Sequence, residues 1–227
     1  MLSDGQVELV LPEGADAGRA LAFAESHRVW IERTRARLLQ RWRLHRAQCG
    51  AIPEAIELLA LGERWQVEQR PVALGAADVQ MMPGHRLSLS CSGTAEGLAL
   101  LRAWLRRRAV ETLPGWLNRV ARQTGLVYAR VQVRLQRARW GSCSSRGTIS
   151  LNAKLLLLPP ELAHYLMVHE LCHTRVMNHS PAFWCLVESR LPGAADLDRT
   201  LRRAACQLPA WLDGSRDVPD LEAEDTR

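Results

Sequence analysis

Alternating apolar and polar side chains form the clearest local pattern in the chain, at residues 127–136. Every second position there is apolar, beginning at Val127, and this period of two indicates a half-buried strand. A shorter alternation at residues 147–152 predicts a second strand, joined to the first by a loop at residues 140–145. The second strand leads almost directly into a long apolar segment.

This apolar segment, residues 160–177, predicts a helix. It begins after Pro159, with Pro160 at the first helical position, where proline is well tolerated. Residues 162–168 are apolar nearly all round, so we expect the helix to be buried rather than to lie on the surface. Polar side chains inside such a helix need partners, because burying them unpaired is unfavourable. The polar residues of this helix are therefore the first candidates for function.

The remaining periodicity predicts an α+β protein. Further helices are expected at residues 15–43, 94–125, 181–191 and 196–207. Short apolar segments between residues 56 and 91, interrupted by glycine and proline, suggest a small antiparallel sheet, and residues 7–11 suggest one more strand. Pro114 lies inside the second of these helices and is expected to kink or divide it.

The length of 227 residues suits one sizeable domain or two small ones, and a hydrophobic share of 47% is sufficient for a core. We expect a β-rich N-terminal subdomain with one helix at residues 1–93. The core domain would follow at residues 94–212, and residues 213–227 would form a polar tail.

The net charge of +6 comes almost entirely from arginine, since Lys154 is the only lysine. Six arginines between residues 33 and 46 could contact nucleic acid, but a solvated helix face is the simpler interpretation. The six cysteines form no C-x-x-C pair, which argues against a zinc ribbon. The chain has no apolar run of membrane-spanning length and no signal-peptide pattern at its start, so we expect a cytoplasmic protein.

The polar residues of the predicted buried helix form the motif H-E-L-C-H, from His169 to His173. Side chains four residues apart lie on one face of a helix, so His169 and His173 would present two imidazoles to one point. Two neutral imidazoles can chelate zinc, and Glu170 is placed to accept a proton from a coordinated water. The motif predicts a hydrolytic zinc site with one ion per chain.

A catalytic zinc site needs a third protein ligand and an open position for water. His179 is the best candidate, because it lies on a predicted turn before Ser180 and Pro181, which should begin another helix. Glu188 on that next helix is the competitor, since some zinc peptidases use a glutamate from a later helix. We expect Glu188 to face the core instead.

The spacing of the three histidines is close to that of metzincins, but Val176 occupies the glycine position of their motif and no methionine follows Met177. The chain instead resembles the YgjP-like metallopeptidase family, which is related to the SprT-like group. The matching segments are Arg139–Cys143, Ile149–Asn152, His169–His173 and Asn178–Trp184, with weaker matches at Ser26–Ile31 and Leu61–Glu63. This resemblance implies a zinc-dependent enzyme with a zincin-like fold, its mixed or antiparallel sheet packed on the helix that carries the motif.

The predicted function is a metallopeptidase with Glu170 as general base and a peptide or protein as substrate. Tyr165, Arg139 and Asn152 are candidates for stabilising the oxyanion. The strand at residues 147–152 either binds an extended peptide by strand addition or is an ordinary edge strand. Two alternatives stay open: hydrolysis of a non-peptide substrate such as a nucleotide phosphoanhydride, and a nucleic-acid-associated protease like SprT-like relatives.

Overall fold

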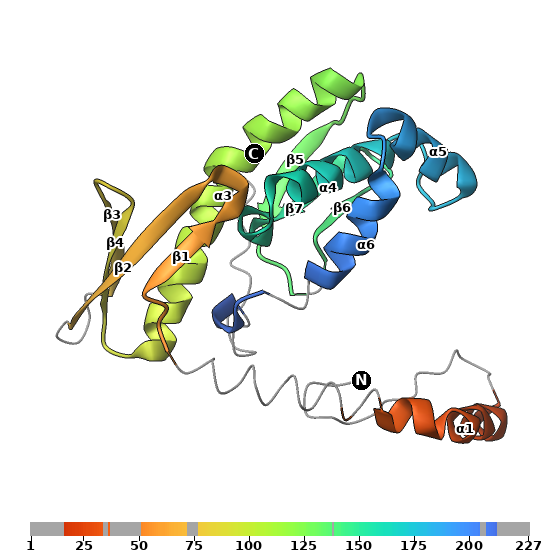
Figure 1. Cartoon of the computed structure of the whole chain (residues 1–227), viewed down its shortest axis with the longest axis horizontal. Helices are drawn as coiled ribbons and strands as arrows, with labels where there is room; N and C mark the ends of the chain where they lie inside the picture. The colour runs from red at the N-terminus through yellow and green to blue at the C-terminus, as the bar shows by residue number, and fades with distance from the viewer. Residues whose placement is uncertain are drawn as a thin grey trace. The chain divides into compact units, whose positions relative to one another are not determined.

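The computed structural model describes residues 16–33, 36, 51–71, 77–137, 139–204 and 208–212. The chain forms two compact units, residues 1–51 and residues 52–227. In the first unit, helix α1 spans Ala17–Ser26, and helical backbone follows at residues 28–33 (Figure 1). The strand expected at residues 7–11, the rest of the helix expected to end near residue 43, and the polar tail lie outside the described residues.

The second unit begins with a four-stranded sheet. Its strands are β1 (Ala55–Leu58), β2 (Glu63–Pro71), β3 (Asp78–Met82) and β4 (Arg86–Cys91), in the order β1-β2-β4-β3. Strands β2 and β4 are parallel, whereas the other two pairs are antiparallel. The expectation of an antiparallel sheet is therefore wrong in part. Apolar segments show where strands lie but not which strands pair. Here β4 lies between β2 and β3, so that β2 pairs with β4 and not with β3, the next strand along the chain.

A second, three-stranded sheet contains β5 (Arg130–Arg134), β6 (Gly141–Cys143) and β7 (Thr148–Asn152), in the order β5-β7-β6. Strand β7 is parallel to β5 and antiparallel to β6. Two expectations are corrected. The loop expected at residues 140–145 contains strand β6, and β7 is the central strand rather than an edge strand. Because both edges of β7 are paired, it cannot accept a peptide; β5 and β6 are the edge strands of this sheet.

The helices follow the sequence prediction closely. They are α3 (Thr94–Thr124), α4 (Pro160–Cys172), α5 (Pro181–Arg190) and α6 (Ala194–Ala204), with short 3-10 helices η1 (Leu59–Leu61), η2 (Ala153–Leu157) and η3 (Ala210–Leu212). Helix α3 continues through Pro114 without dividing and ends at Gly125, whose φ of 68° is the left-handed conformation that glycine adopts readily. Pro160 and Pro181 each stand at the start of a helix, as predicted.

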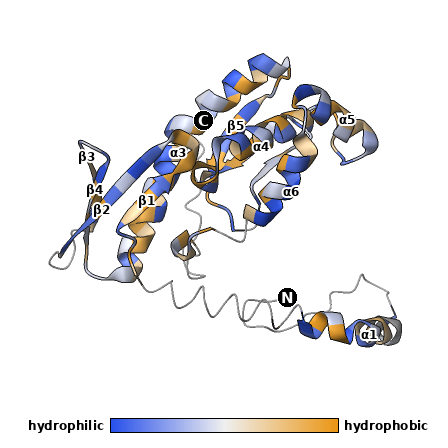
Figure 2. Ribbon diagram, viewed as in Figure 1, coloured by the Kyte–Doolittle hydropathy of each residue, from blue (hydrophilic) through white to orange (hydrophobic). Residues whose placement is uncertain are grey.

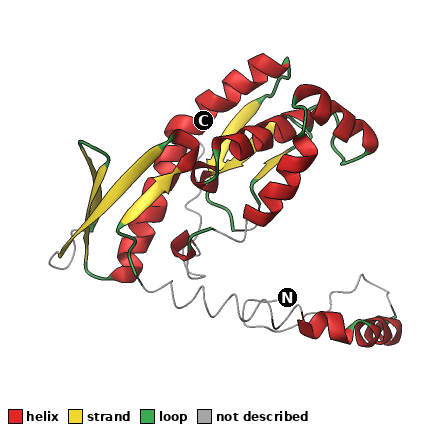
Figure 3. Cartoon of the chain, in the orientation of Figure 1, coloured by secondary structure: helices red, strands yellow, loops and turns green. Residues whose placement is uncertain are grey.

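The core forms where α3 and α4 pack together. Helix α4 contacts α3, α5, α6, β6 and η1, and its apolar residues are buried nearly all round. Figure 2 colours the ribbon by hydropathy, and Figure 3 marks the helices and strands around α4. The first sheet is fixed to α3 by Trp65 against Trp104, at 5.4 Å between ring centroids, and by an ion pair between Glu63 and Arg108. The predicted α+β class is confirmed, with β6 of the second sheet against α4.

Both sheets belong to the second compact unit, and the division expected after residue 93 stays a prediction. Within the part of the chain that the structure describes, no helix has both the length and the apolar character needed to cross a membrane.

Candidate metal centre

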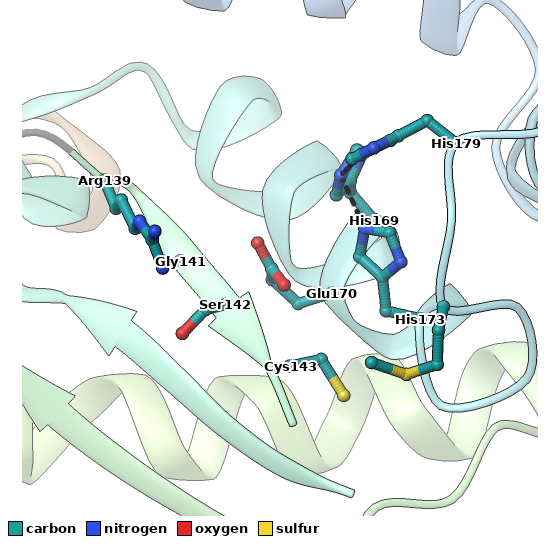
Figure 4. A pocket seen from close by; sticks show the side chains of 9 residues that line it. Arg139, Gly141, Ser142, Cys143, His169, Glu170, His173 and His179 are labelled. Carbon is teal, nitrogen blue, oxygen red and sulfur yellow. Dashed lines mark hydrogen bonds between the residues drawn. The ribbon is translucent and has the colours of Figure 1, made fainter. Parts of the chain in front are cut away.

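Three imidazoles meet at the C-terminal end of α4. His169 lies in the last turn of the helix, His173 is its C-cap residue, and His179 follows on the connection to α5. The Nε2 atom of His169 is 3.1 Å from Nε2 of His179 and 3.2 Å from Nε2 of His173 (Figure 4). All three ligand atoms lie within 4.8 Å of one another. The structure therefore brings together the three histidines that the sequence singled out.

The other ring nitrogen of the two helical histidines is occupied by the protein. Nδ1 of His173 is 3.0 Å from the carbonyl oxygen of Val176, a group that can only accept. Nδ1 of His169 is 3.3 Å from the hydroxyl of Tyr165, which itself donates to Asp198 over 3.0 Å. Each neutral ring has one N–H group, and both contacts favour the tautomer in which Nδ1 carries the proton. The Nε2 lone pairs of His169 and His173 then face each other with no proton between them.

Such an arrangement is suited to a cation. Zinc–nitrogen distances of about 2.0–2.1 Å with tetrahedral angles place ligand nitrogens roughly 3.3 Å apart. Two of the three separations, at 3.1 and 3.2 Å, are close to this spacing, and the third is within 4.8 Å. The three imidazoles thus fit a tetrahedral metal ion with a fourth position left open.

Burial favours the neutral form of His169 and His173. It lowers the pKa of His169 to about 4, with further lowering by the neighbouring His173 and His179. Burial also lowers the pKa of His173. Neutral imidazole is the form that binds metal, so these rings need lose no proton to do so near neutral pH.

Aromatic side chains from the start of α5 hold the imidazoles in place. Phe183 is fully buried and stacks on His173 with ring centroids 4.3 Å apart and an interplanar angle of 21°. Trp184 lies 5.9 Å from both His169 and His179, measured between ring centroids. The helix that follows the third histidine therefore also supports the metal centre.

Glu170 lies beside the imidazoles and is only 4% exposed. Its Oε2 atom has no hydrogen-bond partner among the described residues, and burial raises the pKa of its carboxyl to about 8. A buried, unpaired carboxyl next to three metal-ligand nitrogens lacks a structural purpose of its own, since such burial is unfavourable. It is the kind of group that exchanges protons with a substrate near neutral pH.

Gly141 of β6 makes room for this carboxyl. A Cβ atom at this position would lie 2.7 Å from Oε1 of Glu170 and 2.9 Å from its Cγ. Any larger residue would therefore displace the Glu170 side chain. From the sequence, Gly141 stands out only as part of the family match, because its close contact with Glu170 arises from strand β6, where a loop is expected.

Replacing Gly141 by alanine should thus lower the rate of hydrolysis while leaving the metal bound. A displacement of about 1 Å at a reacting group can reduce a rate on the order of 10²-fold. Measurement of kcat and metal content together would show this separation. Gly115→Ala is the matched control, because the nearest atom to a Cβ there is 3.9 Å away, on Arg119. Full activity of Gly141→Ala would contradict the role given to this contact.

A pocket of about 300 Å³ opens beside Glu170 and the three histidines (Figure 4). Its lining consists of Arg139, Gly141, Ser142, Cys143, His169, Glu170, His173, Met177 and His179. The pocket is lined by residues of α4 and of the edge strand β6, so a ligand in it would touch both.

Comparison with known proteins agrees with this geometry. A family model described as the YgjP-like metallopeptidase domain matches residues 1–204. The chain belongs to the YgjP-like metallopeptidase family. It is accordingly a metal-dependent hydrolase that acts on peptides or proteins. No protein among the curated ones matches it.

Two solved structures are similar to parts of this YgjP-like metallopeptidase. The metallopeptidase zymogen abylysin of Pyrococcus abyssi is 28% identical, with a TM-score of 0.36, and the match covers 40% of this chain and 94% of abylysin. The metallopeptidase zymogen jannalysin of Methanocaldococcus jannaschii is 18% identical, with a TM-score of 0.35, and the match covers 39% of this chain and 91% of jannalysin.

The structure places the three oxyanion candidates of this YgjP-like metallopeptidase differently. Arg139 is exposed and lines the pocket. Tyr165 is fully buried and bonded to Asp198, on the Nδ1 side of His169. Asn152 is 1% exposed, and its amide donates to the carbonyl oxygens of Gln136 and Arg139. Only Arg139 of these three is therefore placed to meet a ligand.

Glu188, the competitor for the third ligand position, lies away from the imidazoles. Its carboxylate accepts hydrogen bonds from the backbone N–H of Gly193 at 2.6 Å and of Ala194 at 3.2 Å, at the start of α6. It is exposed, so the expectation that it faces the core is wrong. Its position in the last turn of α5 lets it cap the next helix instead.

Proposed function

We propose that this chain is a zinc-dependent metallopeptidase in which His169, His173 and His179 hold the ion and Glu170 is the general base. The observation that carries the proposal is the convergence of three imidazole Nε2 atoms beside a buried carboxyl whose Oε2 has no hydrogen-bond partner among the described residues. Zinc prefers imidazole nitrogen in tetrahedral sites, and three protein ligands with an open position are typical of catalytic zinc.

When bound, zinc supplies Lewis acidity, which makes water a nucleophile near neutral pH and polarises a carbonyl group. Glu170 accepts the proton of the attacking water and then donates it to the leaving nitrogen. The raised pKa of its carboxyl suits this exchange, because the group must both take and release a proton. Tight packing against Gly141 fixes the carboxyl in position.

The substrate of this proposed reaction is an extended peptide. Strand β6 pairs on one side only, with β7, and its residues line the pocket next to Glu170. A peptide can add to such an edge through main-chain hydrogen bonds. Arg139, just before β6, would then supply positive charge to the developing oxyanion.

The purified protein is expected to contain about one zinc ion per chain, the stoichiometry of a three-ligand site. Elemental analysis after purification without chelators or added metal would measure it. An N-ligand site also accepts nickel or cobalt, so a refolding series in single metals would identify the preferred ion. Absence of any divalent metal, with no uptake from solution, would overturn the proposal.

A substrate screen distinguishes peptide hydrolysis from the two alternatives. Peptides and nucleotides would each be incubated with wild type and with Glu170→Gln. Only turnover that is lost in the variant would be assigned to this site. Binding of DNA with a steep salt dependence would favour the nucleic-acid-associated protease instead.

A cytoplasmic location stays a proposal that rests on the dispersed cysteines. The structure has free thiols at Cys91, Cys143, Cys172 and Cys185.

A further inference from the structure

We infer that Tyr165 and Asp198 form a hydrogen-bonded relay that sets the ring orientation and the tautomer of His169, so that helix α6 is part of the metal centre. This inference rests on the proposed role of His169 as a metal ligand. It assigns positioning roles to two residues outside the H-E-x-x-H motif, one of them from a different helix.

The relay begins one helical turn before His169. Tyr165 is fully buried, and its ring meets the imidazole edge to face, with centroids 5.8 Å apart. Its hydroxyl is 3.3 Å from Nδ1 of His169 and 3.0 Å from Oδ1 of Asp198 on α6. Helices α4 and α6 pack against each other, which brings the carboxylate to this position.

The available protons determine which group donates and which accepts in each hydrogen bond of the relay. Arg202 donates from Nε to Oδ2 of Asp198 over 2.8 Å, so the carboxylate is paired with a cation and can only accept. The single hydroxyl proton of Tyr165 therefore goes to Asp198. The hydroxyl oxygen is then left to accept the Nδ1–H of His169, and Nε2 carries the lone pair.

Removing different members of the relay should have different effects. In Tyr165→Phe, Nδ1 of His169 loses its acceptor and the ring is no longer held. In Asp198→Ala, the Tyr165 hydroxyl loses its own acceptor and is free to donate to Nδ1. The ring proton would then move to Nε2 and point at the metal position. Asp198→Ala should consequently be the more harmful change, and adding Tyr165→Phe to it should restore part of the loss.

Zinc affinity, measured by competition with a chromophoric chelator, tests this ranking of the variants. Loss of a partner behind a metal-bound histidine typically lowers affinity 10–100-fold. We expect losses in this range for both single variants and a smaller loss in the double variant than in Asp198→Ala. Asp196→Ala is the matched control, since Asp196 lies on the same helix in an ion pair with Arg199 whose side chains are 76% and 67% exposed. This control should bind zinc as wild type does.

Histidine ¹⁵N NMR of the metal-free protein gives a second measurement that a merely structural role would not change. Wild type should show His169 as the Nδ1–H tautomer, and Asp198→Ala should shift it toward Nε2–H while thermal unfolding stays cooperative. If Tyr165→Phe fails to fold, Asp198→Ala alone decides, because the Asp198 side chain is 19% exposed whereas Tyr165 is fully buried.

The outcomes separate the two proposals. Wild type that takes up no zinc would overturn the proposed function. Wild type that binds zinc, with equal affinity in Asp198→Ala and Asp196→Ala and an unchanged tautomer, would overturn the relay and leave the proposed function intact.

Discussion

Hydrolysis is expected to fall at least about 10²-fold when Glu170 is replaced by glutamine, the effect typical of losing a positioned base. Glutamine keeps the size and polarity of the side chain, and all three imidazoles remain. The carboxyl makes no hydrogen bond through Oε2 among the described residues, so folding should not depend on its charge. Wild type and variant would be compared for kcat on a verified peptide substrate, for zinc content and for thermal unfolding.

Glu161→Gln provides the control for this experiment. Glu161 is exposed in the first turn of α4, at the opposite end of the helix from the imidazoles, and its replacement should leave the rate unchanged. Two results would argue against the mechanism. Full activity with zinc bound would show that Glu170 is not the base, and loss of zinc only in Glu170→Gln would make this residue a ligand.

Zinc affinity is expected to drop sharply in His179→Ala and to be unchanged in Glu188→Ala. His179 offers its Nε2 atom 3.1 Å from that of His169. Removing a direct ligand should exceed the 10–100-fold loss that follows removal of a residue behind a ligand. Glu188 instead caps α6 through Gly193 and Ala194, so its replacement should lower the free energy of unfolding by about 1 kcal/mol.

The two variants therefore have opposite signatures, and each serves as the control for the other. Chelator competition measures the affinity, and denaturant unfolding of the metal-free proteins measures the stability. Retention of zinc by His179→Ala together with loss from Glu188→Ala would reverse the assignment of the third ligand. Equal retention in both would mean that the ion is held elsewhere.

The sequence was sufficient for those features that depend on local geometry. Helical spacing put His169 and His173 on one face, and proline positions predicted where α4 and α5 begin. The proximity of His179 to the two helical imidazoles also followed, because only a short turn separates them. These predictions needed no knowledge of which elements pack together.

Features that depend on tertiary pairing were missed. Strand β6 is only three residues long and contains glycine, serine and cysteine, so it carries no alternation that marks a strand. The closeness of Gly141 to Glu170 exists only because β6 packs on α4. Asp198 likewise reaches Tyr165 only through the packing of α6 on α4. A short polar strand and a single aspartate on a polar helix look ordinary in the sequence until the fold places them.

Solvent exposure increases from one imidazole of the centre to the next. His173 is 8% exposed, His169 is intermediate, and His179 is exposed on a connection between two helices. The pair on the buried helix is the more shielded from solvent, whereas the third ring lies on an exposed connection that solvent reaches most easily. Exchange of an ion held by these residues should therefore start at His179, while His169 and His173 stay in place on α4. Stiffening this connection would slow the dissociation of the ion more than it would change the equilibrium occupancy.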